Sequence, residues 1–309
     1  MSPRVITLLM DIGLVVTWSS GFIGGKLASA TDSIFLVLFW RFVITTLILL
    51  PFTFNNTRFL SWRILIQQMV IGSLAMFGYL GCVVAAIHLG VPAALVALIA
   101  ALQPLATAAL AGPVLKQDVG KLEWLGLFIG FAGVAVSVAG NLEKASALGF
   151  GLALLSMLCL VAGTLLTKRV ESAPSLGSSM TIQSFTTAIL FAPLALYIDN
   201  TLMFSTDIQF WKAVMWFVLL STLAAYGLYW GCVERVGAVN VACLIYLSPP
   251  VTALWALVMF NEAIATATIA GFVISVAGIM LSLKNSNHDS NNKDDNETQS
   301  ENRQNTASR

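Results

Sequence analysis

Charge is the scarcest property of this chain. Only 10% of its 309 residues are charged and the formal net charge is +1, whereas soluble domains carry roughly 25% charged residues. A balance so close to zero leaves no basic surface for nucleic acid. Together with a hydrophobic content of 58%, the shortage of charge indicates a chain that lies largely in lipid.

Groups that perform catalysis or bind metals are scarce as well. The two histidines are His88, in a short turn, and His288, in a polar tail, and no apolar stretch carries a His/Asp/Glu cluster or a Gly-x-Ser-x-Gly motif. A membrane-embedded enzyme needs such groups together, and an ATPase needs a Gly-x-x-x-x-Gly-Lys run, which is missing. The sequence therefore predicts no enzymatic activity, no metal and no other cofactor.

The four cysteines do not form a recognisable framework. They all fall inside apolar stretches without metal-ligand spacing, at Cys82, Cys159, Cys232 and Cys243. This pattern favours small buried side chains over a disulfide framework or a zinc site.

The apolar residues come in stretches close to the ~20 residues that cross a hydrocarbon core. Because lipid offers backbone groups no partner, each stretch should be a helix. We therefore predict an all-α integral membrane protein with ten transmembrane helices. The expected spans are 5–27, 34–54, 64–87, 92–112, 122–140, 147–167, 178–198, 210–232, 239–260 and 267–283.

The two ends of the chain need separate interpretation. The first stretch is longer than the ~7–15-residue apolar region of a signal peptide and contains Asp11, so we interpret it as a retained helix. Residues 285–309 hold almost no apolar side chain, and such a composition predicts a disordered tail.

The ten spans form two groups of five with matching internal spacings. Intervals of 22 and 7 residues separate Pro104, Gly126 and Gly133, and likewise Pro249, Gly271 and Gly278. We therefore predict one repeat at 1–140, a second at 141–284 and the tail at 285–309. An odd number of spans inverts the second copy in the membrane, and inverted repeats form a midplane site that opens to either side, as in secondary transporters.

Basic residues near the span ends predict the orientation. With the N-terminus inside, nine of them fall on the inner side and three on the outer side. The inner set is Arg4, Arg58, Arg63, Lys116, Lys121, Lys168, Arg169, Arg235 and Lys284, and the outer set is Lys26, Lys144 and Lys212. Because basic residues accumulate in the cytoplasm, both termini should be cytoplasmic.

Several short motifs occur in an order typical of a known family. They are Trp18-Ser19-Ser20-Gly21-Phe22 with Lys26, Arg41-Phe42, Gly90-Val91-Pro92-Ala93, Gly237-Ala238-Val239, and Leu247-Ser248-Pro249 followed by Asn261-Glu262. In order, spacing and duplication, residues 5–283 resemble the EamA-type drug/metabolite transporters, ten-helix carriers built from two inverted five-helix repeats. The chain departs from the repeat pattern where Gln117 stands in the first half and Glu262 in the second.

The resemblance implies a multi-pass carrier of a bacterial inner membrane that moves small metabolites, often amino acids or related amphipathic compounds, by alternating access. Export is favoured, and import or exchange by the same fold is the alternative. A channel or a membrane-embedded enzyme is a weaker alternative. The partners expected are a small-molecule substrate, the lipid bilayer and, as a candidate coupling ion, the proton. Monomer and homodimer both remain open.

Arg41 is the most informative polar residue inside a span. It lies about seven residues into the second span, roughly 10 Å from the outer surface at 1.5 Å per residue. A central arginine costs ~2.5–3.5 kcal/mol on insertion scales, so it should face a cavity or a partner. It is a candidate for binding a substrate carboxylate, with a structural hydrogen-bonding role as the alternative. Its repeat counterpart is Gln183, which keeps the hydrogen bonds and loses the charge.

Asp11 is the corresponding acidic candidate. It lies about six residues into the first span from the inner side, where a carboxylate could titrate and couple proton flow to transport. A neighbouring helix or interfacial water is the alternative partner. Asp11 and Arg41 enter from opposite faces, so the sequence does not predict a direct ion pair.

Prolines fall at matching places in the fourth and ninth spans. Pro104 and Pro249, the latter followed by Pro250, each remove a helical hydrogen bond. Interrupted helices in matched positions of two halves indicate a binding site, so these prolines are candidate hinges. A tolerated kink is the alternative.

Aromatic residues with polar tips gather in the first, third, eighth and ninth spans, where they could face a cavity or belong to the interfacial belt. The family resemblance places the first, third, fourth, sixth, eighth and ninth helices around the cavity and so adds Thr164. The candidate substrate-binding residues are Trp18, Ser19, Arg41, Tyr79, Gln103, Thr164, Gln183, Tyr226, Trp230 and Tyr246.

Overall fold

All regular structure in the described residues is helical. The computed structural model describes residues 3–53, 61–103, 105–107, 110, 121–140, 146–170, 174–236, 241, 244–278 and 280–281. The first half contains α1 Pro3–Ser29, α2 Ile34–Leu49, η1 Leu50–Phe52, α3 Trp62–Gly72, η3 Ser73–Gly78, α4 Tyr79–His88, α5 Ala93–Ala101 and α7 Lys121–Ala139. The second half contains α8 Ala147–Thr167, α9 Leu176–Leu194, η4 Ala195–Asp199, α10 Ile208–Trp216, η5 Phe217–Ala224, α11 Ala225–Val236 and α13 Ser248–Phe260, followed by the helix Thr266–Gly278.

Each of the ten expected stretches contains helix within the described part of the chain. Five helices are long and apolar enough to cross a membrane: Arg4–Ser29, Trp62–His88, Ala147–Thr167, Leu176–Asp199 and Ile208–Tyr229. The other five are apolar helices of 10–17 residues. The all-helical class predicted from the sequence is thereby confirmed for the described residues.

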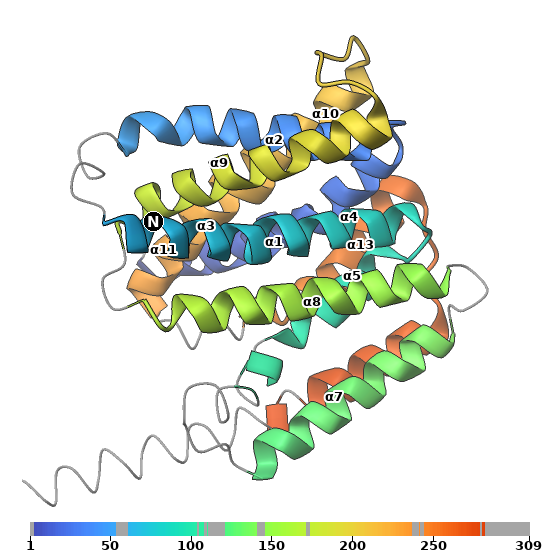
Figure 1. Cartoon of the computed structure of the whole chain (residues 1–309). Coiled ribbons are helices and arrows are strands. Elements are labelled where there is room, and N and C mark those ends of the chain that lie inside the picture. The colour runs from blue at the N-terminus through green and yellow to red at the C-terminus, as the bar shows by residue number, and fades with distance from the viewer. Residues whose placement is uncertain are drawn as a thin grey trace, which may run out of the picture.

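Helices of the two halves pack closely against each other, and two of the pairs join repeat equivalents. α2 lies along α9, and α5 lies against α13. α1 packs against η5, α11 and α13 of the second half, while α8 packs against η3, α4 and α5 of the first. In Figure 1 the blue α2 and the yellow α9 run side by side at the top of the bundle, with α3 and α4 beneath them and α8 below these. Side chains from both halves therefore meet along the middle of the molecule.

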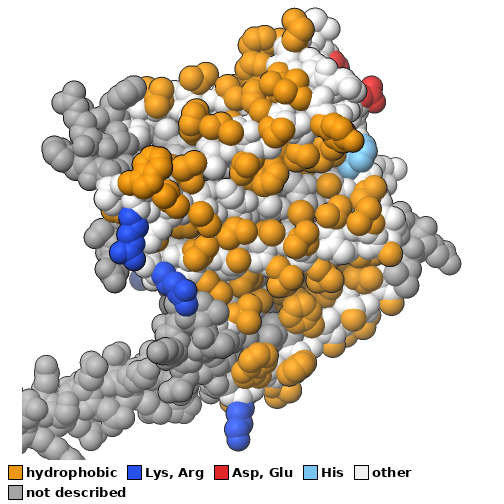
Figure 2. All heavy atoms as spheres, in the orientation of Figure 1, with side chains coloured by type: hydrophobic (Ala, Val, Ile, Leu, Met, Phe, Trp, Pro, Cys, Tyr) orange, Lys and Arg blue, Asp and Glu red, His pale blue; other side chains and the backbone are white. Residues whose placement is uncertain are grey.

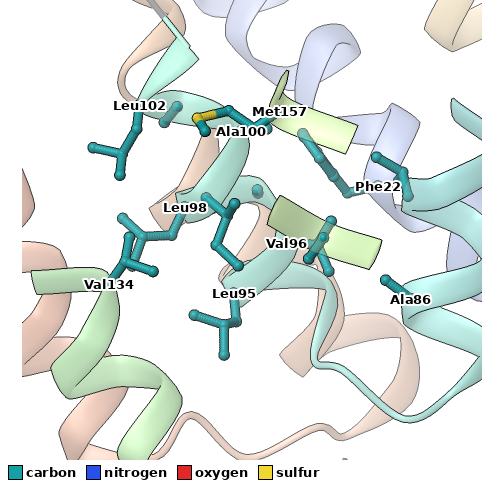
Figure 3. Packing of buried hydrophobic residues seen from close by; sticks show 14 of the residues in the cluster. Phe22, Ala86, Leu95, Val96, Leu98, Ala100, Leu102, Val134 and Met157 are labelled. Carbon is teal, nitrogen blue, oxygen red and sulfur yellow. The ribbon is translucent and has the colours of Figure 1, made fainter. Parts of the chain in front are cut away.

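The centre of one hydrophobic cluster is α5, whose nine residues are all buried. A helix that is apolar on every side belongs inside a bundle. Figure 3 shows its leucines and valine directed toward α1, α4, α7 and α8, with Leu95 and Leu98 beside Val134 and with Phe22 on the opposite side. This buried helix leads directly to Gln103 and the break described below.

Small residues bring α7 and the helix Thr266–Gly278 close together. A Cβ on Gly133 would lie 2.6 Å from the Gly271 carbonyl oxygen, a separation that only glycine permits. Ser275 Oγ donates to the Gly130 carbonyl oxygen at 3.0 Å. These contacts agree with the expectation that small residues allow close approach of two apolar helices. The pair lies along one edge of the bundle in Figure 1.

Three long helices contain π-helical segments, two of them in equivalent places. η3 directly precedes Tyr79, and η5 ends two residues before Tyr226. Tyr79 and Tyr226 are repeat counterparts. A π-helical turn shifts the register of the side chains that follow, and such turns occur frequently at functional sites. The duplication therefore draws attention to the residues around both tyrosines.

The chain also breaks in equivalent places within the fourth and ninth expected spans, beside α5 and α13. After α5 the chain turns at Leu102, and before α13 it turns at Tyr246 and Leu247. Pro249 and Pro250 consequently lie in the first turn of α13, where a proline costs no hydrogen bond, rather than inside a continuous helix. Pro104 lies outside the described residues.

One end of the bundle carries a contact between opposite charges. Lys26 Nζ, in the last turn of α1, lies 3.3 Å from Glu262 Oε2, just beyond α13. At the same end of α1 the chain continues into α2, whose Leu36 backbone N–H donates to Asp199 Oδ2 at 2.7 Å. Both contacts join a segment of the first half to one of the second. The repeat counterpart of Glu262, Gln117, lies outside the described residues.

Candidate functional site

The site begins with Arg41, which α2 places inside the bundle. Its side chain is 4% exposed. Nη2 donates to Thr222 Oγ1 at 3.3 Å, and the guanidinium carbon lies 4.3 Å from the ring centre of Phe217 and 5.0 Å from that of Phe42. Cation–π contacts of this kind stabilise a desolvated arginine. Thr222 and Phe217 both belong to η5, so the π-helical segment of the second half holds the arginine of the first.

The remaining donors of Arg41 are open. Nε and Nη1 are buried, and neither has a hydrogen-bond partner among the described residues. The ion pair observed in the described part of the chain joins Lys26 to Glu262 and does not involve Arg41. A buried charge whose donors are unmet is costly to keep. A bound anion would satisfy these donors, and a carboxylate suits the planar guanidinium in particular.

Aromatic side chains from both halves lie next to this arginine. The ring centre of Trp18 is 5.9 Å from that of Tyr226 and 5.8 Å from that of Tyr229. Tyr226 and Tyr79 are both within electrostatic range of the Arg41 guanidinium. The structure thus brings together four of the candidate residues, Trp18, Arg41, Tyr79 and Tyr226, from spans one, two, three and eight.

The helix breaks carry two further groups of candidate residues. Ser19 Oγ on α1 donates to the Ser248 carbonyl oxygen at 3.3 Å. Gln103 Nε2 donates to Thr164 Oγ1 on α8 at 3.1 Å, and to Thr107 Oγ1 at 3.1 Å. In each half, the residue before the proline is therefore hydrogen-bonded to the first helix of the other half.

Two predicted site residues lie in other surroundings. Gln183 does not join Arg41: its Nε2 donates to Gln68 Oε1 on α3 at 2.8 Å. Tyr246 is 9% exposed and belongs to the cluster around α5, against which Tyr79 also packs. The Trp230 backbone lies in α11, and its side chain falls outside the described residues.

Asp11 lies beside the second half but away from Arg41. Its carboxylate lies near the Cys232 thiol of α11, and its Oδ1 is buried without a hydrogen-bond partner in the described part of the chain. No ion pair joins it to Arg41 among those residues. The expectation of separate positions for these two charges agrees with this arrangement.

Sequence reasoning missed the residues that hold Arg41. Thr222 and Phe217 look like ordinary members of an apolar span, and a π-helical turn has no sequence signature that places them. Trp216, close to the start of its span, has the position of an interfacial-belt residue, yet its Nε1 donates to the Ser20 carbonyl oxygen inside the bundle at 2.9 Å. One signal was available: the repeat counterpart of Thr222 is Ala75, so the hydroxyl occurs only in the half that meets the arginine.

Glycines on α1 explain why η5 can approach Arg41 so closely. A Cβ on Gly24 would lie 2.6 Å from the Phe217 ring, and one on Gly21 would lie 2.9 Å from Ser221 Oγ. Side chains at these positions would displace η5. The Trp18–Lys26 motif of α1 therefore supplies a tryptophan to the aromatic group and a smooth surface for the helix that carries Phe217.

Two cavities lie outside the Arg41 group. One, of about 20 Å³, is lined by Pro92, Ala94, Ala253, Ala256, Glu262, Ala263, Ile264, Ala265 and Thr268. The other, of about 400 Å³, lies between α3 and α9 and is lined by Trp62, Ile66, Met69, Val70, Ser73, Thr186, Ile189 and Leu190. Neither cavity is lined by Arg41, whose guanidinium packs against the rings of Phe42 and Phe217.

Comparison with known proteins agrees with this architecture. The chain is 23% identical, over 222 residues, to a protein of Salmonella typhimurium (strain LT2) described as "Probable amino-acid metabolite efflux pump"; the match covers 68% of this chain and 73% of the relative. A solved structure described as "Crystal structure of protein" has the same fold, with a TM-score of 0.62, 18% identity, and coverage of 90% of this chain and 96% of the other.

The family assignment comes from the sequence pattern of the "EamA-like transporter family". It matches twice, over residues 5–139 and 147–284, which together span most of the chain. The duplicated match falls on the two halves whose equivalent helices pack together in the structure. This protein is therefore a multi-pass membrane protein that belongs to the EamA-like transporter family.

Proposed function

We propose that this protein exports small amphipathic metabolites, amino acids or related compounds, by alternating access. Ten membrane spans, in two inverted repeats at 1–140 and 141–284, rock about a central site in the bacterial inner membrane. Both termini lie in the cytoplasm. The basic residues at the span ends support this orientation, and the Salmonella relative's description supports the substrate class and the direction.

One observation carries the proposal: the buried guanidinium of Arg41 has two nitrogens without hydrogen-bond partners among the described residues. In this mechanism, the substrate carboxylate binds Arg41, and the apolar part of the substrate lies against Trp18 and Tyr226. Arg41 comes from the first half, and the Thr222 that orients it comes from the second. A carboxylate bound there contacts both halves, and its release accompanies their separation.

The hydrogen bonds at the helix breaks connect the two halves where they move relative to each other. Ser19–Ser248 and Gln103–Thr164 each join a broken helix to the first helix of the other half. Rocking requires these bonds to break and re-form, and Pro249 and Pro250 localise the bending at the start of α13. Asp11 is the proposed proton-coupling group, since a partly unpaired intramembrane carboxylate is a functional group by default.

Transport into inverted vesicles and proteoliposomes tests the proposal, using a panel of labelled amino acids, nucleosides and drugs. We expect saturable flux for carboxylate-bearing compounds, and a loss of at least tenfold in Arg41→Gln. Phe128→Ala, on the exposed face of α7, is the matched control and should transport normally. Absence of saturable flux for every compound would refute the carrier function, and full activity of Arg41→Gln would refute the site.

A further inference from the structure

The larger of the two cavities described above belongs to neither the Arg41 group nor the helix breaks. It is the groove of about 400 Å³ between α3 and α9, and its volume lies within the ~300–1,000 Å³ range of ligand sites. Its walls come from two helices long and apolar enough to cross a membrane. The groove therefore opens on the side of the protein that meets the bilayer.

The chemistry of the groove suits an apolar ligand. Its two hydroxyls are already used, since Ser73 Oγ donates to the Met69 carbonyl oxygen and Thr186 Oγ1 to that of Ile182, both at 2.8 Å. The other lining side chains are hydrophobic, and Trp62 among them is 72% exposed. A ligand in this groove gains van der Waals contact, and neither hydroxyl has a free proton to donate to it.

The two walls are held at a fixed separation beneath the groove. Gln68 on α3 and Gln183 on α9 share a hydrogen bond of 2.8 Å. At Gly72 the helices come so close that a Cβ would lie 2.8 Å from Gln183 Cα. Because α3 and α9 cross closely at Gly72 while apolar side chains beside the crossing stay exposed, the groove between them is preformed. Because α3 belongs to the first half and α9 to the second, the occupant touches both.

A positive charge lies at the end of the α3–α9 groove. Arg63 is exposed and occupies the first turn of α3. It precedes Ile66 by three residues and Val70 by seven, a spacing that places all three on one stripe of the helix. Figure 2 shows hydrophobic side chains over this face of the molecule, with basic side chains at the end where α3 begins. An anionic group beside Arg63 would complete a ligand whose apolar part fills the groove.

We propose that the α3–α9 groove binds one acyl chain of an anionic bilayer phospholipid, whose phosphate contacts Arg63. A phospholipid carries an acyl chain that suits the apolar groove and, at its headgroup, a phosphate that suits Arg63. Basic residues beside intramembrane grooves attract anionic headgroups. A second copy seated on the same face by two-fold symmetry would match the apolar part, but it would bring its own Arg63 to the same depth in the membrane and so add a like charge instead of an anion. The charge therefore favours lipid over a dimer contact. The site is separate from the proposed transport function and stands without it.

Fluorescence of Trp62 tests the site in the full-length protein. The protein is placed in nanodiscs of phosphatidylcholine that contain brominated phosphatidylglycerol or, separately, the same fraction of brominated phosphatidylcholine. The Trp62 signal is the difference between wild type and Trp62→Phe. We expect phosphatidylglycerol to quench it with about fivefold higher apparent affinity, the factor that ~1 kcal/mol per basic residue near the surface would give.

Two matched pairs of variants identify the groove and the charge. Arg63→Gln should remove the preference for phosphatidylglycerol, whereas Arg4→Gln, an exposed arginine on α1, should keep it. Val70→Phe fills the groove and should reduce quenching, whereas Val258→Phe, at a side chain of α13 that is 81% exposed, should leave it unchanged. Equal quenching by both lipids, unaffected by Arg63→Gln, would overturn the proposal, because it indicates ordinary contact with the bilayer. Absence of quenching, together with disulfide formation between copies of a Trp62→Cys variant under oxidising conditions, would overturn it in favour of a dimer contact.

Discussion

The contact between Lys26 and Glu262 leads to an asymmetric prediction. Nζ and Oε2 are 3.3 Å apart, and at an effective dielectric constant of ~20 their gross attraction is about 5 kcal/mol. The Lys26 side chain is 35% exposed and that of Glu262 is 22% exposed, so water screens much of this attraction. Exposed pairs contribute ~0.2–1 kcal/mol, and we expect a coupling near the upper end, about 1 kcal/mol.

The two single substitutions should differ in cost. Glu262 Oε2 is itself buried and has no other hydrogen-bond partner among the described residues. Lys26→Met therefore leaves an uncompensated buried carboxylate oxygen, which costs about 1–3 kcal/mol. Glu262→Gln leaves a lysine that can extend into water, and it should cost less than ~1 kcal/mol. In the double variant, the cost of Lys26→Met should fall by about 1 kcal/mol, the expected coupling.

A double-mutant cycle measures these differences by denaturant titration in detergent micelles, with Lys212→Met, an exposed lysine on α10, as the control. The reasoning fails if Glu262→Gln is at least as destabilising as Lys26→Met, or if the coupling is zero within error. Loss of coupling in 1 M salt, where the Debye length falls to ~3 Å, would show in addition that the contact is governed by solvent screening.

Three further substitutions test other parts of the structure. Thr222→Val should raise the KM of a carboxylate substrate several-fold with little change in maximal rate, and Thr222→Ser should restore it, because the hydroxyl accepts from Arg41 Nη2; the reverse split would contradict a positioning role. Gly133→Leu should separate α7 from the Thr266–Gly278 helix and lower thermal stability by several degrees, whereas Gly151→Leu, where a Cβ meets nothing within 4 Å, should not. Asp11→Asn should abolish the pH dependence of transport, and an unchanged pH profile would remove Asp11 from the coupling mechanism.

The repeat architecture was readable from the sequence because its signals are local. Ten apolar stretches predict helices through the cost of unpaired backbone groups in lipid, and equal spacings of proline and glycine predict the duplication. The structure then placed repeat equivalents against each other, as α2 with α9 and α5 with α13. The polar residues selected inside spans were useful predictions too, since Trp18, Arg41, Tyr79 and Tyr226 gather near one point.

Residue partnerships were not readable, because they depend on helix rotation and on distances between segments far apart in the chain. Arg41 and Gln183 hold equivalent repeat positions, yet one meets Thr222 and the other meets Gln68. The π-helical turn of η5 changes which side chains face inward, and no motif announces it. Trp216 is a further case, because its position near a span end does not reveal that its Nε1 donates to the Ser20 carbonyl oxygen.

The sequence alone determined that this chain is a helical membrane protein in two halves, because hydrophobicity and spacing are properties of short segments. The tertiary structure decided how the halves interact. A buried arginine from the first half is held by a threonine and a phenylalanine from the second, and its Nε and Nη1 have no hydrogen-bond partner among the described residues. That arrangement arises from close packing at Gly21 and Gly24 and from the register of η5, which only the folded chain defines.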